Sequence, residues 1–354
     1  MEKYNAVIIT NLPAFYKTLL YNKLAKTLKI KVIYISNTSN IRSKDFSLGE
    51  LEFDYEVINE EAYESRSKLI TILRLRAALS SIKYDYLLYP GWEIKELLAL
   101  AFYIPKKKNC VVIESSIKET KTSGIAWWLK KLFLKRMSKA FPSGYLQHEI
   151  LTRANFNGEV KLTHGVGIIN RNIITSVNQV QNKNKNKNKN YKYLYVGRLS
   201  SEKNLEFLVN IFNENKKKLT IVGDGPLKEK LQSLAKPNIT FIGYIENSYL
   251  SKVYNTHDVF VLPSLSEPWG LVVDEALWHK LPVIVSNVVG CSEDLVRKTN
   301  AGFIFKLNSN HSLNNAIETV EANYEKLLQN VEKIDFSQRE QDQINAYLSI
   351  LQGR

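Results

Sequence analysis

Two carboxylates, Glu267 and Glu275, lie eight residues apart in the stretch 264–296. Pro268 and Gly270 between them indicate a turn that enters a helix, because proline is favoured in the first helical turn. The first amide groups of a helix have no partner within it and lie at the positive end of its dipole, which suits phosphate. A carboxylate can accept hydrogen bonds from two hydroxyl groups at once, which suits a vicinal diol. The stretch therefore predicts a site for a small ligand that is both anionic and hydroxylated.

Two basic residues earlier in the chain could bind the anionic part of such a ligand. Arg198 and Lys203 follow an apolar strand predicted at 193–196. Arg offers a planar fork of donors and Lys a mobile point charge, and both pair with a diphosphate. The simpler alternatives are that both are ordinary exposed bases, that Glu267 only complements a helix dipole, and that Glu275 lies on a solvated helix face.

The elements that must position these residues alternate between apolar strands and amphipathic helices. The first half opens with strand 6–10, helix 15–29 and strand 31–36, and the pattern restarts at strand 193–196. Such alternation favours parallel sheets covered by helices. The predicted fold class is therefore α/β, with two Rossmann-like parallel-sheet domains facing each other across a cleft. Ligands of such folds bind at the carboxyl ends of the strands.

One low-complexity run sets the predicted domain boundaries. Residues 182–190 have the sequence NKNKNKNKN, which offers no apolar side chain to bury. We predict an N-terminal domain at 1–181, an Asn/Lys linker at 182–192 and a C-terminal domain at 193–337. A C-terminal helix at 338–354 is expected to pack back on the N-terminal domain. Ligand binding by the lysines of the run is the alternative to a linker.

Positive charge is concentrated in the first half of the chain. The 354 residues carry a formal net charge of +14 at pH 7. Residues 1–181 hold 27 Lys and Arg against 16 Asp and Glu, whereas residues 193–354 hold 17 against 19. A basic face favours an anionic partner such as a membrane surface, a phosphorylated substrate or nucleic acid. No nucleic-acid recognition motif accompanies the charge, so we expect no nucleic-acid partner.

Several sequence features favour a cytoplasmic setting. No apolar run approaches the roughly 20 residues that span a bilayer. The first residues lack the pattern of a secretory signal peptide. Cys110 and Cys291 are the two cysteines, and they match no disulfide or metal-binding pattern.

The segment 124–141, GIAWWLKKLFLKRMSKAF, predicts an amphipathic helix with one apolar and one basic side. Tryptophan, lysine and strong amphipathic character are typical of helices that lie in a membrane interface. Each basic residue near an anionic leaflet adds roughly 1 kcal/mol. We expect the first domain to be peripheral on the inner face of the plasma membrane, and the alternative is a core-packing helix with a solvated basic face. The residues expected at the membrane are Trp127, Trp128, Lys131, Lys135 and Lys139.

Five sequence elements carry a family resemblance, and they occupy about 100 residues of the second half. In this order and spacing they closely resemble the retaining glycosyltransferases of family 4, which have the GT-B fold. The first half resembles that family mainly in its strand and helix pattern. The five elements are VGRLSSEKNL at 196–205, VGDGP at 222–226, FIGYI at 241–245, LPSLSEPWGLVVDEA at 262–276 and LPVIVSNVVGCSEDLV at 281–296.

The resemblance implies a role for each motif residue. Arg198 and Lys203 would stabilise the charge that grows on the leaving diphosphate, and such aimed charge is usually the largest catalytic contribution. Glu267 would hold hydroxyls of the donor sugar, and Glu275 those of the ribose. Backbone amides at the helix start would face phosphate, a glycine turn would let the backbone approach it, and the FIGYI loop would flank the base. The implied donor-binding residues are Gly197, Arg198, Lys203, Tyr244, Ile245, Glu267, Gly270, Leu271, Glu275 and Gly290.

The first half departs from the family's pattern in ways that bear on catalysis. Glu114 follows a predicted strand at 110–113, where relatives often carry a histidine, so a catalytic role and a core or capping role both stay open. His148 and His164 are weaker candidates, since most single histidines are structural. The chain contains no Asp-x-Asp motif, which tells against the metal-dependent transferase fold. We therefore expect catalytic residues Glu267, Arg198, Lys203 and Glu114, with no metal and no cofactor.

The resemblance and the basic first half together predict a retaining, metal-independent hexosyltransferase. Its partners would be a nucleotide-diphosphate sugar as donor and a glycan as acceptor. A lipid-linked acceptor in O-antigen, capsule or lipopolysaccharide synthesis fits the charge of the first half. The alternatives are a soluble glucan- or sucrose-type GT-B transferase and a non-catalytic GT-B module that binds nucleotide or glycan. Intact Arg198, Lys203, Glu267 and Glu275 disfavour the non-catalytic alternative.

Overall fold

The computed structural model describes residues 2–41, 50–169 and 190–352. The chain divides into two compact units, and each is described by itself. Unit 1 comprises residues 1–168 and 337–354, and unit 2 comprises residues 169–336. The division falls 13 residues before the expected domain end at 181. The predicted linker lies outside the described residues up to position 189.

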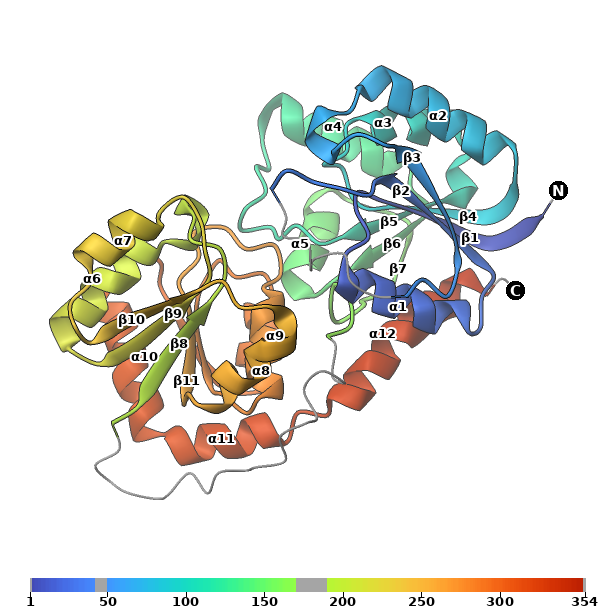
Figure 1. Ribbon diagram of the computed structural model, residues 1–354. Helices are drawn as coiled ribbons and strands as arrows, with labels where there is room; N and C mark the ends of the chain where they lie inside the picture. Colours follow the sequence, from blue (N-terminus) through green and yellow to red (C-terminus); the bar gives the residue numbers. More distant parts are fainter. Residues whose placement is uncertain (1, 42–49, 170–189, 353–354) are drawn as a thin grey trace. The chain divides into compact units, whose positions relative to one another are not determined.

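The described strands of unit 1 form one seven-stranded parallel sheet in the order β3-β2-β1-β4-β5-β6-β7 (Figure 1). The interior strand β1 places Ile8 opposite Val32 of β2 and Leu88 of β4. The order reverses between β1 and β4, which makes a topological switch point at the carboxyl edge of the sheet. The strands are β1 (Lys3–Thr10), β2 (Ile30–Ser36), β3 (Asp54–Asn59), β4 (Lys83–Tyr89), β5 (Asn109–Ile113), β6 (Lys139–Pro142) and β7 (Glu159–Val160).

Helices cover both faces of this sheet and enclose two apolar clusters. One face packs against α1 (Phe15–Ala25) and α12 (Phe336–Leu351), and the stacked rings of Phe141 and Tyr347, 4.7 Å apart, join α12 to the sheet. From residue 337 on, α12 therefore belongs to the core of unit 1. The other face packs against α2 (Lys68–Ser80), α3 (Glu96–Tyr103), α4 (Gly124–Lys135) and α5 (Tyr145–Arg153) (Figure 1).

The predicted helix at 124–141 is wrong beyond residue 135. Helix α4 ends at Lys135, and the chain then enters strand β6, where Ala140 lies opposite Val111 of β5. Ala140 and Phe141 are buried because they belong to this sheet strand. A short apolar run does not distinguish a buried strand from a helix, which explains the error. Lys139 consequently lies on β6, where its ammonium group pairs with Glu159 at 2.9 Å.

The described strands of unit 2 form a six-stranded parallel sheet in the order β10-β9-β8-β11-β12-β13. Strand β8 pairs with both β9 and β11, so the order reverses between β8 and β11. This is the switch point of the second sheet. The strands are β8 (Lys192–Val196), β9 (Lys218–Val222), β10 (Ile239–Gly243), β11 (Val259–Leu262), β12 (Val283–Ser286) and β13 (Gly302–Phe305).

The strands of unit 2 alternate with helices, as the sequence pattern predicts. A short 3-10 turn at Ser201–Lys203 precedes α6, and a π-helix at Ser292–Arg297 follows β12. The α-helices of unit 2 are α6 (Leu205–Asn215), α7 (Lys228–Leu234), α8 (Asn247–Asn255), α9 (Leu271–Trp278), α10 (Asn310–Ala322) and α11 (Tyr324–Glu332).

Candidate functional site

Lys203 and Glu267 form an ion pair at the switch point of unit 2. Lys203 ends the turn after β8, and Glu267 lies between β11 and α9. The Lys203 Nζ atom is 2.6 Å from Glu267 Oε2, and both side chains are largely buried. Ser264 Oγ also donates to Glu267 Oε2 at 3.2 Å. Residues 64 positions apart in the sequence therefore meet at the edge where ligands of this fold class bind.

The turn that carries Glu267 is fixed by hydrogen bonds on both sides. The carbonyl of Glu267 accepts from the amide of Gly290 at 2.9 Å, and Cys291 donates to the carbonyl of Trp269 at 2.9 Å. The buried Trp269 indole Nε1 donates to Asp274 Oδ2 at 2.8 Å, which ties the turn to the first turn of α9. These bonds fix the backbone of the turn, and the Glu267 carboxylate itself is held by the side chains of Lys203 and Ser264.

Gly270 lets the chain enter α9 directly after this turn. Its φ of 101° lies in the left-handed region that favours glycine. A Cβ at this position would lie 3.1 Å from Val289 Cγ1 and 3.4 Å from Glu267 Cγ. Helix α9 starts at the next residue, Leu271, and its first amides have no intrahelical partner. The carboxylate of Glu267 and an anion-binding helix start therefore occupy adjacent residues.

Arg198 is exposed at the carboxyl end of β8, beside the same switch point. The buried Tyr195 hydroxyl donates to the Arg198 carbonyl at 3.0 Å and holds the turn at Gly197. Burial raises the pKa of Tyr195 far above its usual value, and Glu267 and Glu202 add to the effect. Tyr195 therefore stays a neutral donor, and the Arg198 guanidinium is left to solvent or to a ligand.

Glu275 lies one helical turn into α9 and accepts a hydrogen bond from the Tyr254 hydroxyl at 2.9 Å. The pKa of Glu275 is raised from its usual 4.5 to about 7, mainly by burial and to a smaller extent by the neighbouring Asp274. The Tyr254 hydrogen bond acts in the opposite direction, because it favours the ionised carboxylate. Glu275 is consequently a carboxyl that changes charge near neutral pH.

The other predicted donor-binding residues lie around these elements. Tyr244 and Ile245 directly follow β10, and Tyr244 is exposed. The amide of Gly290 already donates to Glu267, so it would have to leave that partner to reach a phosphate. Gly197 precedes Arg198, and its amide donates to the Val222 carbonyl.

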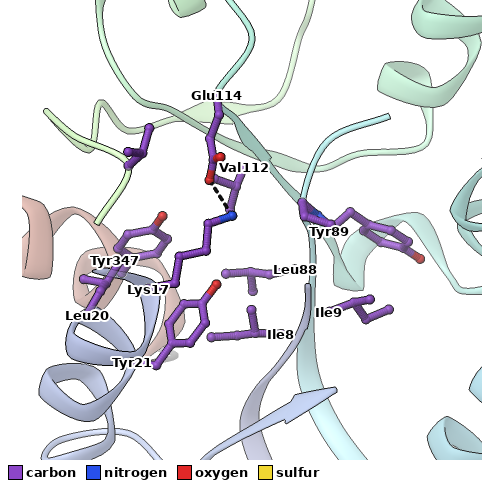
Figure 2. A pocket seen from close by; sticks show the side chains of 12 residues that line it. Ile8, Ile9, Lys17, Leu20, Tyr21, Leu88, Tyr89, Val112, Glu114 and Tyr347 are labelled. Atoms are coloured by element: carbon purple, nitrogen blue, oxygen red, sulfur yellow. Dashed lines mark ion pairs between the residues drawn. The ribbon is translucent and has the colours of Figure 1, made fainter. Parts of the chain in front are cut away.

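The first-half candidate Glu114 lines a pocket in unit 1 (Figure 2). The buried Lys17 of α1 reaches Glu114, with its Nζ atom 2.8 Å from Glu114 Oε1. Burial disfavours the charged form of Lys17, but Glu114, Tyr16 and Tyr21 outweigh it and raise the pKa of Lys17. The apolar walls come from β1 and β4, the two strands at the switch point of unit 1, together with Tyr347 of α12. They include Ile8, Ile9, Leu88 and Tyr89.

The weaker histidine candidates have structural surroundings. His164 adopts a positive φ of 57°, and its carbonyl accepts from Arg339 Nη2 of α12 at 2.7 Å. His148 is half-buried on α5. Neither residue lines the pocket at Glu114.

The residues predicted at a membrane separate into two groups. Trp127 is buried in the core of unit 1 and Lys139 lies on β6, so these two do not belong to an exposed helical face. Trp128 and Lys135 are exposed on α4, and Lys131 is half-buried there. None of the helices in the described ranges is both long and apolar enough to cross a bilayer. In the same ranges no three His, Cys, Asp or Glu side chains are grouped to hold a metal ion.

Several side chains that position the predicted residues have little or no signal in the sequence. Lys17 and Tyr254 act through contacts between separated segments, and no spacing in the sequence indicates them. Tyr195 acts within its own turn, on the carbonyl of Arg198 three residues later. The Trp269–Asp274 bond joins neighbours within the quoted motif. A buried indole N–H usually has a polar partner, and that rule could have indicated this bond.

The second half of the chain is similar to proteins of a known family. Residues 176–334 match the family model described as Glycosyl transferases group 1. The uncharacterised glycosyltransferase MJ1607 of Methanocaldococcus jannaschii is 32% identical over 123 residues, which cover 32% of this chain and 32% of that protein. The sulfoquinovosyl transferase SQD2 of Arabidopsis thaliana is 40% identical over 118 residues, 31% of this chain and 22% of that protein. The O-antigen biosynthesis glycosyltransferase WbnH of Escherichia coli is 34% identical over 143 residues, 38% of this chain and 40% of that protein. These matches therefore span less than half the length of each of these relatives.

Solved structures match over nearly the whole chain. The Anabaena protein Alr3699/HepE in complex with UDP has a TM-score of 0.70 at 16% identity, and the match covers 99% of this chain and 100% of that one. The lipopolysaccharide outer core galactosyltransferase WaaB has a TM-score of 0.70 at 13% identity, with 99% of each chain covered. At such identities the likeness concerns the fold. The chain therefore has the two-domain GT-B fold, and its residues 176–334 are similar to the glycosyl transferases of group 1.

Proposed function

We propose that the protein is a retaining, metal-independent hexosyltransferase that moves a sugar from a nucleotide-diphosphate sugar to a hydroxyl group of a glycan. One observation carries the proposal. The Lys203–Glu267 ion pair lies at the switch point of unit 2, next to the start of α9. The arrangement offers a cation and helix amides to a diphosphate, and a carboxylate to sugar hydroxyls. The family match of this unit supports the same chemistry.

Each donor-binding residue has a place in this proposal. Arg198 and Lys203 bind the diphosphate and stabilise the negative charge that it gains as the sugar departs. The first amides of α9 add the positive end of the helix dipole. Glu267 accepts hydrogen bonds from the sugar and Glu275 from the ribose. Tyr244 flanks the nucleobase together with its neighbour Ile245.

The acceptor is assigned to unit 1. Glu114 faces the pocket at the switch point of that unit, where its carboxylate could bind or orient an acceptor hydroxyl. The basic first half and the O-antigen relative support a lipid-linked glycan of surface-polysaccharide synthesis as the acceptor. The enzyme would then work as a peripheral protein on the inner face of the plasma membrane.

A donor panel tests this function. The purified protein is incubated with UDP-glucose, UDP-galactose, GDP-mannose and other nucleotide sugars, with and without EDTA, and thermal shift and sugar release are measured. We expect one donor to stabilise the protein and to be hydrolysed slowly in either condition, and NMR to show that the released sugar first appears in the donor's anomeric configuration.

Variants separate the outcomes of this panel. The Glu267→Ala variant should lose hydrolysis, and the Glu229→Ala variant on the exposed start of α7 should keep it. Binding without hydrolysis, and without transfer to any glycan, would favour a non-catalytic module. Transfer to soluble glucose or fructose phosphates would favour the sucrose-type alternative.

A further inference from the structure

Helices α2 and α4 of unit 1 expose large apolar side chains that are not packed into the core of the unit. In α2, Leu69 and Leu73 are 75% and 64% exposed, whereas Leu75 is buried. In α4, Ile125 and Trp128 are 79% and 58% exposed. We call the exposed set the apolar rim, and it consists of Leu69, Ile70, Leu73, Ile125, Trp128 and Leu129.

The two halves of the apolar rim lie at the same edge of the sheet. Helix α2 follows β3 and helix α4 follows β5, and all strands of this sheet are parallel. The first turns of both helices therefore lie at the carboxyl edge. Both helices also pack their inner sides on the same apolar cluster, so they cover one face of the sheet (Figure 1). The rim residues occupy the N-terminal halves of α2 and α4, at the edge that also carries Glu114.

The charge on these two helices restricts what can cover the rim. The basic residues of α2 and α4 are Lys68, Arg74, Arg76, Lys130, Lys131 and Lys135, and neither helix contains an acidic residue. Acidic residues do occur in the segments that precede these helices, at Glu60, Glu61, Glu64, Glu114 and Glu119. A second copy of this face would bring like charges together, which opposes a symmetric dimer. An anionic bilayer surface accepts both the apolar residues and the lysines.

We propose that the apolar rim is a membrane-inserting surface for anionic lipid, formed jointly by α2 and α4. It differs from the single helix predicted at 124–141, because α2 supplies half of the apolar side chains and Trp127 and Lys139 supply none of the exposed surface. The rim places the carboxyl edge of unit 1 against the bilayer. A glycan attached to a membrane lipid would thereby reach Glu114 without leaving the membrane, and this part rests on the proposed function.

Flotation with vesicles tests the surface. The full chain is mixed at low salt with vesicles of phosphatidylglycerol and phosphatidylethanolamine, or of phosphatidylcholine alone. Wild type should float with the anionic vesicles. When it is mixed with the neutral vesicles, most of the protein should remain unbound in the bottom fraction. Leu69→Ser/Leu73→Ser in α2 and Ile125→Ser/Trp128→Ser in α4 should each lower the partition coefficient, by roughly tenfold per side chain. The matched control is Leu234→Ser/Ile242→Ser, which removes two exposed apolar side chains from unit 2.

Each result has a distinct meaning. The proposal is overturned if wild type does not bind anionic vesicles, if the α2 variant binds as wild type does, or if the control loses as much binding as the rim variants. Concentration-dependent self-association that the rim variants abolish, without vesicle binding, would make the rim a protein interface instead. Donor hydrolysis by the rim variants should equal that of wild type. Vesicle binding by a protein that hydrolyses no donor would refute the proposed function and leave the membrane surface standing.

Discussion

Lys203 and Glu267 neutralise each other across the switch point of unit 2, with 2.6 Å between the ammonium nitrogen and the carboxylate oxygen. The two residues are assigned to different parts of the donor, the diphosphate and the sugar. Under the proposed roles, a diphosphate that binds Lys203 would compete with Glu267 for its ammonium group. Binding of the diphosphate would thereby release the carboxylate for the sugar hydroxyls.

This pairing predicts opposite effects of two variants on the affinity for the nucleoside diphosphate. Lys203→Met removes a phosphate ligand, so the protein should bind the nucleoside diphosphate more weakly. Glu267→Gln removes the competitor of the phosphate, so the protein should bind it as tightly as wild type or more tightly. Both variants should lower kcat for sugar transfer, by roughly 10²–10³. Isothermal titration calorimetry measures the affinities, and steady-state kinetics measures kcat.

The Glu229→Gln variant serves as the matched control, because it changes an exposed carboxylate on α7 of the same unit. It should leave both affinity and kcat unchanged. If Glu267→Gln weakened binding of the nucleoside diphosphate as much as Lys203→Met did, the two side chains would not compete for one site. The assignment of Glu267 to the sugar would then be withdrawn.

The raised pKa of Glu275 predicts a pH-dependent affinity for the donor. Only the ionised carboxylate accepts hydrogen bonds on both oxygens, and the pKa of Glu275 is about 7. Donor affinity should therefore rise with pH up to about 7 and then level off, with a slope of up to ~tenfold per pH unit below that point. Titration of a nucleotide sugar between pH 5.5 and 8.5 measures this dependence.

Two variants determine whether Glu275 causes it. Tyr254→Phe removes a hydrogen bond that lowers the pKa of Glu275, so the midpoint should move to higher pH. The Glu275→Gln variant should bind the nucleotide sugar weakly, and its affinity should show no pH-dependent transition in this range. An unchanged pH profile in both variants would assign the titration to another group.

The same carboxyl has a predictable effect on folding. A group whose pKa is raised in the folded state loses its stabilising contribution as pH rises. For Glu275 this loss spans the range from about 4.5, where the unfolded chain ionises, to about 7. The free energy of unfolding of Glu275→Gln should therefore fall less than that of wild type over this range, as chemical denaturation at each pH would show.

The fold was predictable, and the donor residues could be proposed, because the signals for both are local. Apolar runs of strand length alternate with amphipathic helices, and the motif residues Arg198, Lys203 and Glu267 occur within short, ordered elements. The helix predicted at 124–141 failed where strand β6 continues the apolar pattern of α4. The Lys17–Glu114 pair was not predictable, because α1 and β5 meet only through the sheet, 97 residues apart in sequence.

The unequal burial of that pair predicts an order of stabilities. Lys17 is more deeply buried than Glu114. Glu114→Ala leaves a buried ammonium group without its partner, and breaking a buried pair in this way costs about 3–5 kcal/mol. Lys17→Met leaves the Glu114 carboxylate without its partner. Because this carboxylate is more exposed, the loss of unfolding free energy should be smaller. The double variant Lys17→Met/Glu114→Leu should be more stable than Glu114→Ala alone, since no charge remains buried.

Hydrogen exchange of peptides from β1 and β5 measures these losses within unit 1. A second readout separates stability from catalysis. If Glu114 assists transfer, the double variant should fold well and still transfer sugar slowly, whereas its hydrolysis of the donor should stay close to that of wild type. If the double variant transferred sugar as fast as wild type, the role of Glu114 would be structural only.

Two glycines of unit 2 with positive φ should respond very differently to substitution by alanine. Gly223 follows β9, and a Cβ there would lie 1.9 Å from the Gly197 carbonyl oxygen, directly before Arg198. Gly243 ends β10 with a φ of 83°, and nothing lies within 4 Å of its Cβ position. Gly243→Ala should therefore lower the free energy of unfolding only by the cost of a left-handed backbone conformation, which is about 1–2 kcal/mol. Gly223→Ala should cost more and also weaken binding of the nucleoside diphosphate, because the chain must move at Gly197. Thermal unfolding and calorimetry would measure both effects, and equal losses in the two variants would contradict this close packing of the strand ends.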